Sequence, residues 1–500
     1  MWRQYTRGVP DDIRDAFQAG SHVRKKGVPP FQDLCLSLCL ESSGRTTFSA
    51  ISPTARSKLQ FPKVEGAAQV NPASSKFKRS AYSARTTALS FKFNRARYVL
   101  LTIVFATVCA SAQTVTTIHD FGSRADGENP QSGVVFDPNG NIYGTAALGG
   151  RKGHGTAYQL VPPAGEQGQW AETIVHQFAG QPDGATPDSV LTRSADGRLF
   201  GTTQLGGSKN LGSVFVVVPP RVSRGLWKER VLYSFGSVPN DGTGPNMGLV
   251  ARSGALLGVT VDGGINRRGT VFQLTPSSDP LAAWTETILY SFAASPDGGF
   301  PSSDLAMDRG GNLYGVTLLG GANNLGAVYR LSPPTSQGGP WTESVLFSFS
   351  GPDGSSPFGR LLLDKSGALY GTTSGGGASQ AGTVFKLTPQ PDDVWAQQVL
   401  YSFSGGADGG SPEAGVIMGQ NGRLLGTAST GGAGPLSGGV VFQLDPPRVG
   451  GAWTETVLHS FGGPDGFRPL SRLVSRSGAL FGTTSAGGLK GTGTVFKLVP

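Results

Sequence analysis

Short segments that each follow a proline hold polar residues whose types suit binding or acid–base chemistry. These residues are Asp188, Asn246, Asp304, Arg360, Glu413 and Arg472. Two carboxyl groups on either side of a glycosidic bond can act as general acid and general base, as in a glycan hydrolase or lyase. Asp188, Asp304 and Glu413 are therefore the candidate catalytic residues. The mixed charges also suit a polar ligand, and no two carboxyl groups have a sequence spacing that identifies an acid–base pair.

A second set of candidate residues follows pairs of adjacent glycines. It consists of Arg151, Lys152, His154, Lys209, Arg267, Arg268 and Lys490. These side chains predict a basic crescent that attracts an anionic polysaccharide or an acidic protein, with Arg360 and Arg472 as further binding residues. The alternative is that they are ordinary solvated surface cations.

Aspartate followed by glycine recurs along the chain. The aspartates are Asp126, Asp183, Asp241, Asp297, Asp353, Asp408 and Asp465. A calcium site needs six or more oxygen ligands around one point. A single carboxylate per recurrence indicates turn chemistry instead, because Asp caps its own turn and Gly accepts a positive φ.

Two kinds of aromatic position invite a ligand interpretation, and packing explains both. His119, His176 and His459 occupy a position where other recurrences have Tyr or Phe, so we predict a packing position and no metal site. Six tryptophans recur at one position and could stack on sugars, but identical placement favours packing between repeats. They are Trp170, Trp227, Trp284, Trp341, Trp395 and Trp453. The chain contains no H-E-x-x-H, P-loop or dinucleotide motif, so no cofactor is predicted.

All these residues occur at corresponding positions in the copies of one sequence repeat. Its anchoring phenylalanines are Phe121, Phe178, Phe235, Phe292, Phe349, Phe403 and Phe461, spaced by 57, 57, 57, 57, 54 and 58 residues. Each repeat holds four strand-like runs, which in the fourth are 304–308, 312–317, 327–331 and 343–349. Four short strands per repeat predict the blade of an all-β propeller with seven blades.

The closure of this ring is also predicted. With the strands of a blade named A to D from the centre outward, the chain ends after the seventh C strand, and the missing D strand lies at 115–121. We therefore expect the N-terminal strand to pair with the last blade and close the ring. We expect the variable B–C loops and the segments after the prolines to lie on one face.

The block LYGTT…GG…GTVFKL, which recurs across residues 115–500, resembles the GloVer tandem-repeat family of exported bacterial proteins. The resemblance implies a propeller-like, exported protein with no established activity.

The charge of the chain is divided unevenly. Residues 1–112 hold 17 Lys and Arg against 6 Asp and Glu, whereas residues 113–500 hold 25 against 27. The overall charge of +9 therefore belongs to the N-terminal part, and we predict no nucleic-acid partner for the repeats.

The N-terminal part divides into two segments. Residues 93–112 combine Arg95 and Arg97, an apolar run of about a dozen residues and Ala110-Ser111-Ala112, which are the parts of a secretory signal cleaved after Ala112. The run is shorter than the ~20 residues of a membrane-spanning helix. We expect residues 1–92 to lack a fold and translation to start shortly before Arg95. Residues 113–500 form the propeller, and their lack of cysteine excludes disulfides there.

The sequence thus favours an exported or cell-surface, monomeric, non-catalytic propeller that binds its partner at the B–C loop face. A propeller enzyme is the first alternative, and a structural protein of the cell envelope is the second.

Overall fold

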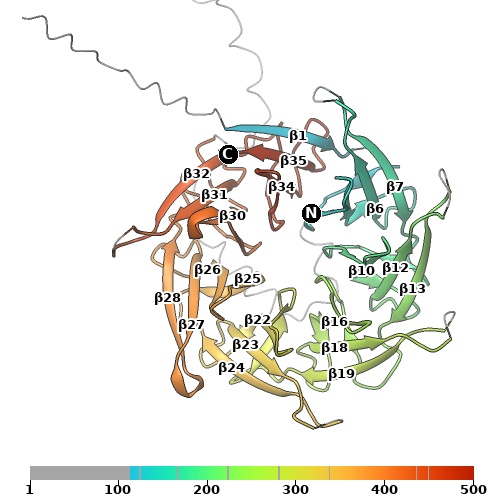
Figure 1. Cartoon of the computed structure of the whole chain (residues 1–500), viewed down its shortest axis with the longest axis horizontal. Helices are drawn as coiled ribbons and strands as arrows, with labels where there is room; N and C mark the ends of the chain where they lie inside the picture. Colours follow the sequence, from blue (N-terminus) through green and yellow to red (C-terminus); the bar gives the residue numbers. More distant parts are fainter. Residues whose placement is uncertain are drawn as a thin grey trace, which may run out of the picture. The chain divides into compact units, whose positions relative to one another are not determined.

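The computed structural model describes residues 113–122, 125–165, 168–221, 225–279, 282–336, 338–434, 436–448 and 450–500. The predictions for residues 1–92 and 93–112 lie outside this part of the chain. The described residues form seven antiparallel sheets arranged in a ring, and they contain no α-helix (Figure 1). The predicted all-β, seven-bladed propeller is confirmed.

Each blade is a sheet of four strands, ordered from the channel outward. Blade 1 consists of β3 (Val135–Phe136), β4 (Ile142–Ala146), β6 (Thr156–Val161) and β7 (Ala171–Gln177). Blade 2 consists of β9 (Thr192–Arg193), β10 (Leu199–Thr203), β12 (Ser213–Val218) and β13 (Lys228–Ser234). Blade 3 consists of β15 (Val250–Arg252), β16 (Ala255–Thr260), β18 (Thr270–Thr275) and β19 (Thr285–Ser291).

Blade 4 consists of β21 (Ala306–Met307), β22 (Leu313–Gly320), β23 (Ala327–Ser332) and β24 (Thr342–Ser348). Blade 5 consists of β25 (Ser355–Leu363), β26 (Leu369–Gly375), β27 (Thr383–Pro389) and β28 (Trp395–Ser402). Blade 6 consists of β29 (Val416–Met418), β30 (Leu424–Ala428), β31 (Val440–Asp445) and β32 (Thr454–Ser460). The short 3-10 turns η1 (Pro391–Asp393) and η2 (Gln420–Gly422) lie in blades 5 and 6.

Blade 7 joins the two ends of the repeat region. It consists of β33 (Val474–Arg476), β34 (Ala479–Thr484), β35 (Thr494–Val499) and, outermost, β1 (Thr114–Asp120) (Figure 1). Strand β1 pairs antiparallel with β35 from Thr114 opposite Val499 to Asp120 opposite Thr494. The predicted closure by the N-terminal strand is therefore confirmed, and this pairing covers the outer edge of β35.

The D–A and B–C connections lie on one face, as predicted. In blades 1 to 3 they pair with each other in two-stranded sheets, which are β2 (Gly127–Glu128) with β5 (Leu148–Gly149), β8 (Gly184–Ala185) with β11 (Leu205–Gly206), and β14 (Gly242–Thr243) with β17 (Asp262–Gly263). In blade 4, β20 (Gly298–Pro301) pairs with β22 in the same way. The Gly149-Gly150 pair that opens the first B–C loop has φ of 78° and 73°, which glycine adopts without steric cost.

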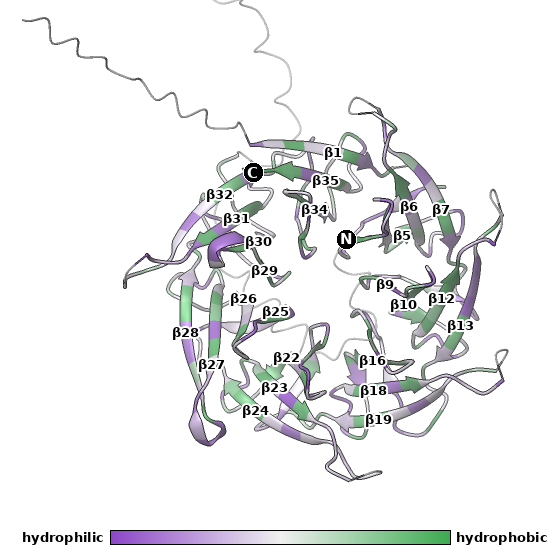
Figure 2. Cartoon of the chain, viewed as in Figure 1, coloured by the Kyte–Doolittle hydropathy of each residue, from purple (hydrophilic) through white to green (hydrophobic). Residues whose placement is uncertain are grey.

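The core lies inside and between the blades, where green apolar stretches of the strands alternate with purple polar ones (Figure 2). Each anchoring Phe is buried and packs edge-on against an aromatic ring in the C strand of the next blade. The ring centroids lie 5.0 to 5.2 Å apart. Glycine in strand B makes room for this ring. A Cβ on Gly144 would overlap the Tyr158 side chain, and one on Gly201 would lie 2.6 Å from Phe215.

The described residues contain no helix that is both long and apolar enough to cross a membrane.

Candidate functional site

Hydroxyl groups of strand B fix the segments that follow the prolines, here called the post-proline segments. In blades 1, 2, 6 and 7 a buried Thr donates a hydrogen bond to a backbone carbonyl in the post-proline segment of the next blade. The pairs are Thr145 with Ser189 (3.1 Å), Thr202 with Met247 (3.0 Å), Thr427 with Ser471 (3.1 Å) and Thr483 with Ser132 (2.9 Å). These bonds join blade to blade around the channel and hold the side chains of its mouth.

All seven post-proline segments meet at one cavity of about 140 Å³ at the mouth of the channel. Besides Ser132, the polar side chains that line it are Gln131, Asp188, Asn246, Asp304, Arg360, Glu413 and Arg472, one from each blade. The structure therefore brings together the three candidate catalytic carboxyl groups and two of the candidate binding residues. Gln131 was missed by the sequence analysis, although it directly follows Pro130 as Asp188 follows Pro187.

The seven side chains enter the mouth from two positions. In blades 1, 2, 3 and 6 the polar residue comes directly after the proline, whereas in blades 4, 5 and 7 it is the third residue after the proline. The four other blades have Gly133, Val190, Gly248 and Gly415 at this third position. A Cβ on Gly248 would lie 3.1 Å from Asp304, and one on Gly415 would overlap the Arg360 backbone. Small residues at the third position thus leave space for the charged side chains of neighbouring blades. The choice between a polar residue at the first position and one at the third could have been used to predict the residues of the mouth from the sequence.

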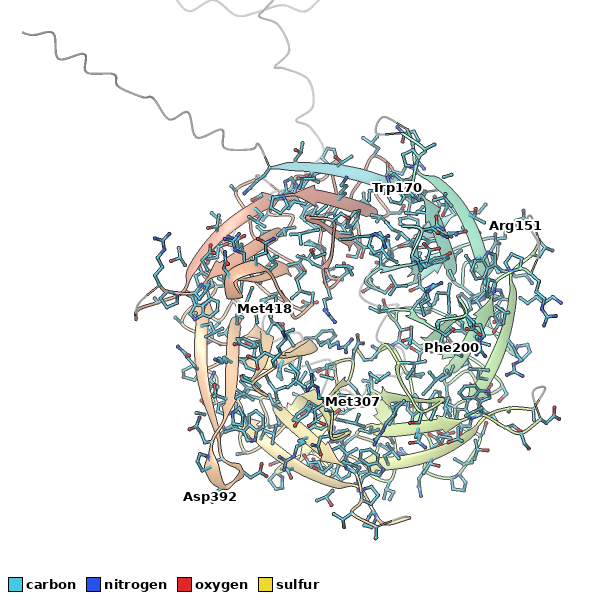
Figure 3. All side chains as sticks on the ribbon, viewed as in Figure 1. Arg151, Trp170, Phe200, Met307, Asp392 and Met418 are labelled. Atoms are coloured by element: carbon cyan, nitrogen blue, oxygen red, sulfur yellow. The ribbon has the colours of Figure 1, made fainter. Side chains whose placement is uncertain are left out.

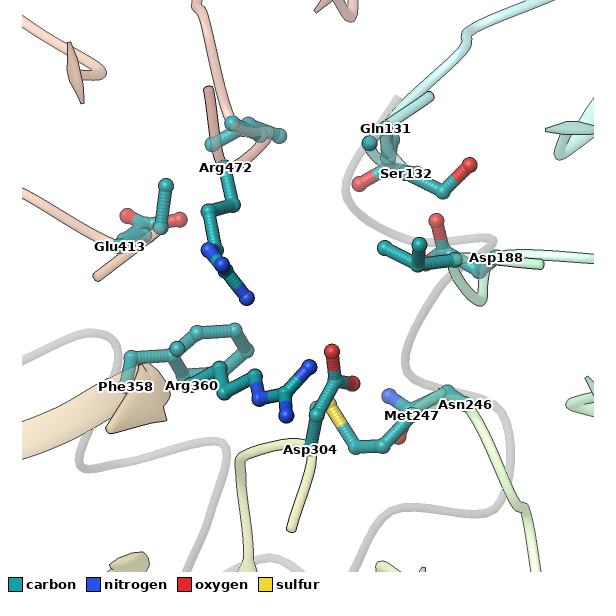
Figure 4. A pocket seen from close by; sticks show the side chains of 15 residues that line it. Gln131, Ser132, Asp188, Asn246, Met247, Asp304, Phe358, Arg360, Glu413 and Arg472 are labelled. Carbon is teal, nitrogen blue, oxygen red and sulfur yellow. The ribbon is translucent and has the colours of Figure 1, made fainter. Parts of the chain in front are cut away.

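The two arginines of the mouth point into the lumen. Figure 4 shows the guanidinium groups of Arg360 and Arg472 directed toward the centre from blades 5 and 7. Neither side chain forms an ion pair or hydrogen bond with a described residue, although each can donate several hydrogen bonds. Burial, followed by the charge of Arg360, lowers the pKa of Arg472, while Asp304 opposes this shift. The mouth therefore holds two cationic donors that are available to an anion.

Burial favours the neutral form of two carboxyl groups near these arginines, those of Asp188 and Glu413. It raises the pKa of Asp188 to about 7. Burial also raises the pKa of Glu413, against the charge of Arg468 and a hydrogen bond from Ser429. Asp304 accepts a hydrogen bond from the backbone N–H of Gly248 at 2.6 Å. The three carboxyl groups approach the lumen from separate sides (Figure 4).

Two oxygen atoms of the mouth are buried without a hydrogen-bond partner. They are one carboxylate oxygen of Asp188 and the side-chain oxygen of Asn246. A buried acceptor without a partner is unfavourable by roughly 1–3 kcal/mol. A ligand that carries hydroxyl groups would satisfy both atoms.

A second cavity of about 540 Å³ adjoins the mouth and shares Asp304, Arg360 and Arg472 with it. Its walls come from the innermost segments of blades 7, 1, 2 and 3, and the apolar residues include Val135, Leu191, Leu249 and Val474. The same three charged side chains therefore line both the small mouth and the larger cavity beside it.

The residues of the predicted basic crescent lie away from the mouth. Arg151, Lys152, Lys209, Arg267 and Lys490 are exposed, and Figure 3 shows Arg151 near the periphery while Met307 and Met418 lie closer to the centre. Arg268 is partly buried, with its guanidinium 4.9 Å from the centre of the Phe300 ring. Exposed aliphatic side chains stand among these cations, notably Leu489 (86% exposed) and Ile265 (71%).

The recurring Asp residues close turns, and the recurring His and Trp residues contact neighbouring aromatic rings. Asp183 accepts hydrogen bonds from the backbone N–H groups of Gly184 (2.7 Å) and Ala179 (2.9 Å), which closes its turn. The three histidines stay apart, and each packs edge-on against the anchoring Phe of its own strand. The tryptophans are partly buried against adjacent blades, as in the 5.9 Å contact between the rings of Trp227 and Tyr143.

A family profile for the Gloeobacter/Verrucomicrobia repeat matches residues 102–281, 224–438 and 396–500. The chain belongs to this repeat family. The resemblance found in the LYGTT…GTVFKL block is thereby confirmed, and it covers the whole propeller.

No curated protein matches the chain in sequence. Similar solved structures include a provisionally identified 6-phosphogluconolactonase from Bacteroides uniformis (14% identity, TM-score 0.44, 70% of this chain and 89% of that one). Another is the extracellular domain of a provisionally identified one-component system from B. thetaiotaomicron (15%, 0.46, 77% and 41%). A third is a PL25 ulvan lyase bound to a sulfated disaccharide repeat (11%, 0.46, 77% and 95%). At these identities and scores, the similarities give no information on activity.

Proposed function

We propose that this protein is an exported, non-catalytic propeller that binds an anionic polysaccharide over its B–C loop face. One acidic group of the polymer sits in the channel mouth between Arg360 and Arg472. The observation that carries this proposal is the pair of lumen-facing guanidinium groups without an ion pair in the described part of the chain. Arginine binds carboxylate and sulfate groups through two parallel hydrogen bonds, which matches this arrangement.

The rest of the mouth favours a sugar as the carrier of the acidic group. The unpartnered oxygens of Asp188 and Asn246 accept hydrogen bonds, so they suit hydroxyl donors. A cavity of about 140 Å³ is smaller than the ~300–1,000 Å³ of pockets that enclose a drug-sized ligand. It therefore admits one sugar-sized group of a longer chain, and the remainder of the chain extends over the face.

The basic crescent supports binding outside the mouth. Exposed cations on blades 7, 1, 2 and 3 raise the local concentration of an anionic polymer. Leu489 and Ile265 add apolar surface next to Lys490 and Arg267, against which the C–H faces of sugars can pack. An acidic protein is the other occupant of this surface, and a binding comparison distinguishes it.

Binding of acidic oligosaccharides, neutral oligosaccharides and acidic peptides to the wild-type protein tests the proposal. Two variants complete the comparison: Arg360→Ala/Arg472→Ala in the mouth and Arg151→Ala/Lys152→Ala/Lys209→Ala in the crescent. We expect the wild type to prefer acidic oligosaccharides, the mouth variant to lose at least tenfold in affinity, and the crescent variant to lose less and to depend less on salt. Preference for peptides, or unchanged affinity of the mouth variant, would overturn the proposal.

A second candidate function, that of a glycan lyase or hydrolase, is favoured by one observation. Burial raises the pKa of Asp188 to about 7, which is the range in which a carboxyl group exchanges protons near neutral pH. Incubation with the polysaccharide that binds, followed by measurement of chain length, decides between the two functions. Shortening that disappears in Asp188→Asn establishes the enzyme, and an unchanged chain length supports the binding protein.

Export is tested at the N-terminus of the secreted protein. We propose cleavage after Ala112, so that the mature chain begins at Gln113, directly before the closing strand β1. N-terminal sequencing that finds a start before residue 90 would contradict this.

A further inference from the structure

The seams between neighbouring blades contain a recurring group of three side chains, here called a seam trio. Its members are the residue two positions before an anchoring Phe, the Asp of the following Asp-Gly turn, and a residue early in the D strand of the next blade. At the seam of blades 2 and 3, the Tyr233 hydroxyl lies 2.8 Å from Asp241 and 3.2 Å from Glu286, and its single hydrogen is shared between the two carboxyl groups. The corresponding trios of the next seam and of the seam of blades 5 and 6 are Tyr290–Asp297–Glu343 and Tyr401–Asp408–Glu455.

Two other seams show that the third carboxyl group is not required for packing. Where Phe347 replaces Tyr and offers no hydrogen bond, the third residue is the uncharged Gln397. Where His459 pairs with Asp465 at 2.6 Å, the third position is the apolar Val115 of the closing strand. A second carboxyl group is therefore retained only where the trio contains a polar partner for it.

The two seams that flank blade 1 combine an imidazole with two carboxyl groups. The first trio is His119, Asp126 and Glu172, and the second is His176, Asp183 and Glu229. In each trio one ligand atom from every residue lies within 4.8 Å of the other two. His119 Nε2 is 3.4 Å from Asp126 Oδ1 and 3.7 Å from Glu172 Oε1. His176 Nε2 is 3.1 Å from Asp183 Oδ2.

Each histidine seam also contains a buried carboxylate oxygen that a cation could contact. One carboxylate oxygen of Glu172 and one of Glu229 are buried and have no hydrogen-bond partner, and the same holds for one oxygen of Glu286, Glu343 and Glu455 in the tyrosine seams. What sets the two histidine seams apart is the imidazole, because a neutral imidazole nitrogen is a common metal ligand and a protonated tyrosine hydroxyl is not. A cation would supply the missing partner for these buried oxygens and would balance the paired carboxylates.

We propose that His119–Asp126–Glu172 and His176–Asp183–Glu229 are two binding sites for a divalent transition metal ion of the zinc type. One imidazole nitrogen and two carboxylate oxygens form a donor set that zinc accepts at ~2.0–2.2 Å, with water in the fourth position. Ligand atoms around such a tetrahedral ion lie about 3.3 Å apart, which small side-chain movements reach from the present spacing. Calcium and magnesium prefer six or more oxygen ligands, which these trios do not provide.

The position of the sites gives them a structural role. His119 lies in the closing strand β1, whereas Glu172 and His176 both lie in β7, the outer strand of blade 1. A metal ion in the first site therefore fastens the closing strand to the next blade, and the second site continues the connection to Glu229 of blade 2. The side chains of His119 and Glu172 remain 14% and 21% exposed, so an ion can enter from solvent.

The chain itself supplies matched variants for the test. His119→Tyr and His176→Tyr each create a trio with the composition that three other seams already have, so the fold should persist. His459→Tyr is the control, because its trio has only one carboxyl group. Zinc content and isothermal titration are measured on the full chain after treatment with a chelator. The difference between variants is decisive, since Cys35, Cys39 and Cys109 can also bind zinc.

We expect each of His119→Tyr and His176→Tyr to lose one zinc ion per chain and His459→Tyr to lose none. Zinc should raise the melting temperature of the wild type and of His459→Tyr, and less so that of His119→Tyr. Equal zinc content in all four proteins would show adventitious zinc only and overturn the proposal, as would loss of zinc in His459→Tyr.

Discussion

At the seam of blades 2 and 3, one tyrosine hydroxyl serves two carboxyl groups, and the backbone N–H groups of Gly236 and Ser237 donate to Asp241 at 2.7 and 2.9 Å. At the channel mouth, by contrast, the guanidinium groups of Arg360 and Arg472 have no such partners among the described residues. Unpartnered acceptor oxygens occur in both regions: they belong to Asp241 and Glu286 at this seam and to Asp188 and Asn246 at the mouth. Both regions consist of charged residues, and both recur around the ring. The seam trios stabilise the packing of blades, whereas the arginines of the mouth keep free donors, which in our proposal bind the acidic group of a ligand.

The largest expected effect on stability comes from the apolar part of a seam. Phe292 is fully buried between blades 3 and 4. Phe292→Ala removes a buried ring and leaves a cavity, which lowers the free energy of unfolding by about 3–5 kcal/mol. Denaturant titration measures this value. A loss below about 1 kcal/mol would contradict the role assigned to the anchoring phenylalanines.

Stability should also depend on pH through the tyrosine seams. Burial, followed by the charge of Asp241, raises the pKa of Glu286 to about 8, and burial raises that of Glu343 to about 7. Because these carboxyl groups hold their protons more tightly in the folded state, each contributes to stability fully when the pH is below the ordinary pKa of 4.5. The contribution decreases above that pH and is lost as the pH rises through about 7 to 8. We therefore expect the melting temperature to fall steadily between pH 5 and pH 8.

The opposite slope should appear in acid. Although burial alone would raise the pKa of Asp408, hydrogen bonds from Ser404 hold it below 3.8, so the stabilisation it provides is lost as the pH falls below that value. Maximum stability is expected near pH 4 to 5. Glu286→Gln, which copies Gln397, should flatten the slope above pH 5. A wild-type profile that rises from pH 5 to pH 8 would contradict this account of the seams.

Substitutions in the mouth should change stability least. Asp188→Asn removes the cost of ionising a buried carboxyl group, so we expect the melting temperature to be unchanged at pH 5 and slightly higher at pH 8. Differential scanning calorimetry at the two pH values checks this. A large loss at both would mean that Asp188 has a structural role like that of the seam aspartates.

The repeat made the fold predictable. Phenylalanines at a nearly constant spacing, four strand-like runs per repeat and the unpaired run at 115–121 together indicated seven blades and their closure by β1, because every blade must bury the same surface. The B–C loops and post-proline segments were also placed correctly on one face.

The sites were less predictable because they combine residues from different repeats. Gln131 was missed, since the comparison of repeats did not separate the first and third positions after the proline. The histidines were compared only with the residues at the same position of other repeats, whereas His119 contacts Asp126 from the next turn and lies near Glu172 from the next blade. Comparison within one position reveals packing roles, and contacts across the seams require the three-dimensional arrangement.

The contrast between seam and mouth is tested most directly by two sets of arginine variants in one channel. Arg476 lines the channel beyond the mouth, but it donates to the Asp137 carbonyl at 2.8 Å and lies 4.9 Å from the Phe136 ring. Titration of the preferred acidic oligosaccharide, together with denaturant unfolding, should show that Arg476→Ala loses stability and keeps its affinity. Arg360→Ala/Arg472→Ala should keep its stability and lose at least tenfold in affinity. The reverse result, or equal effects of both changes on affinity, would contradict the assignment of the mouth as the binding site.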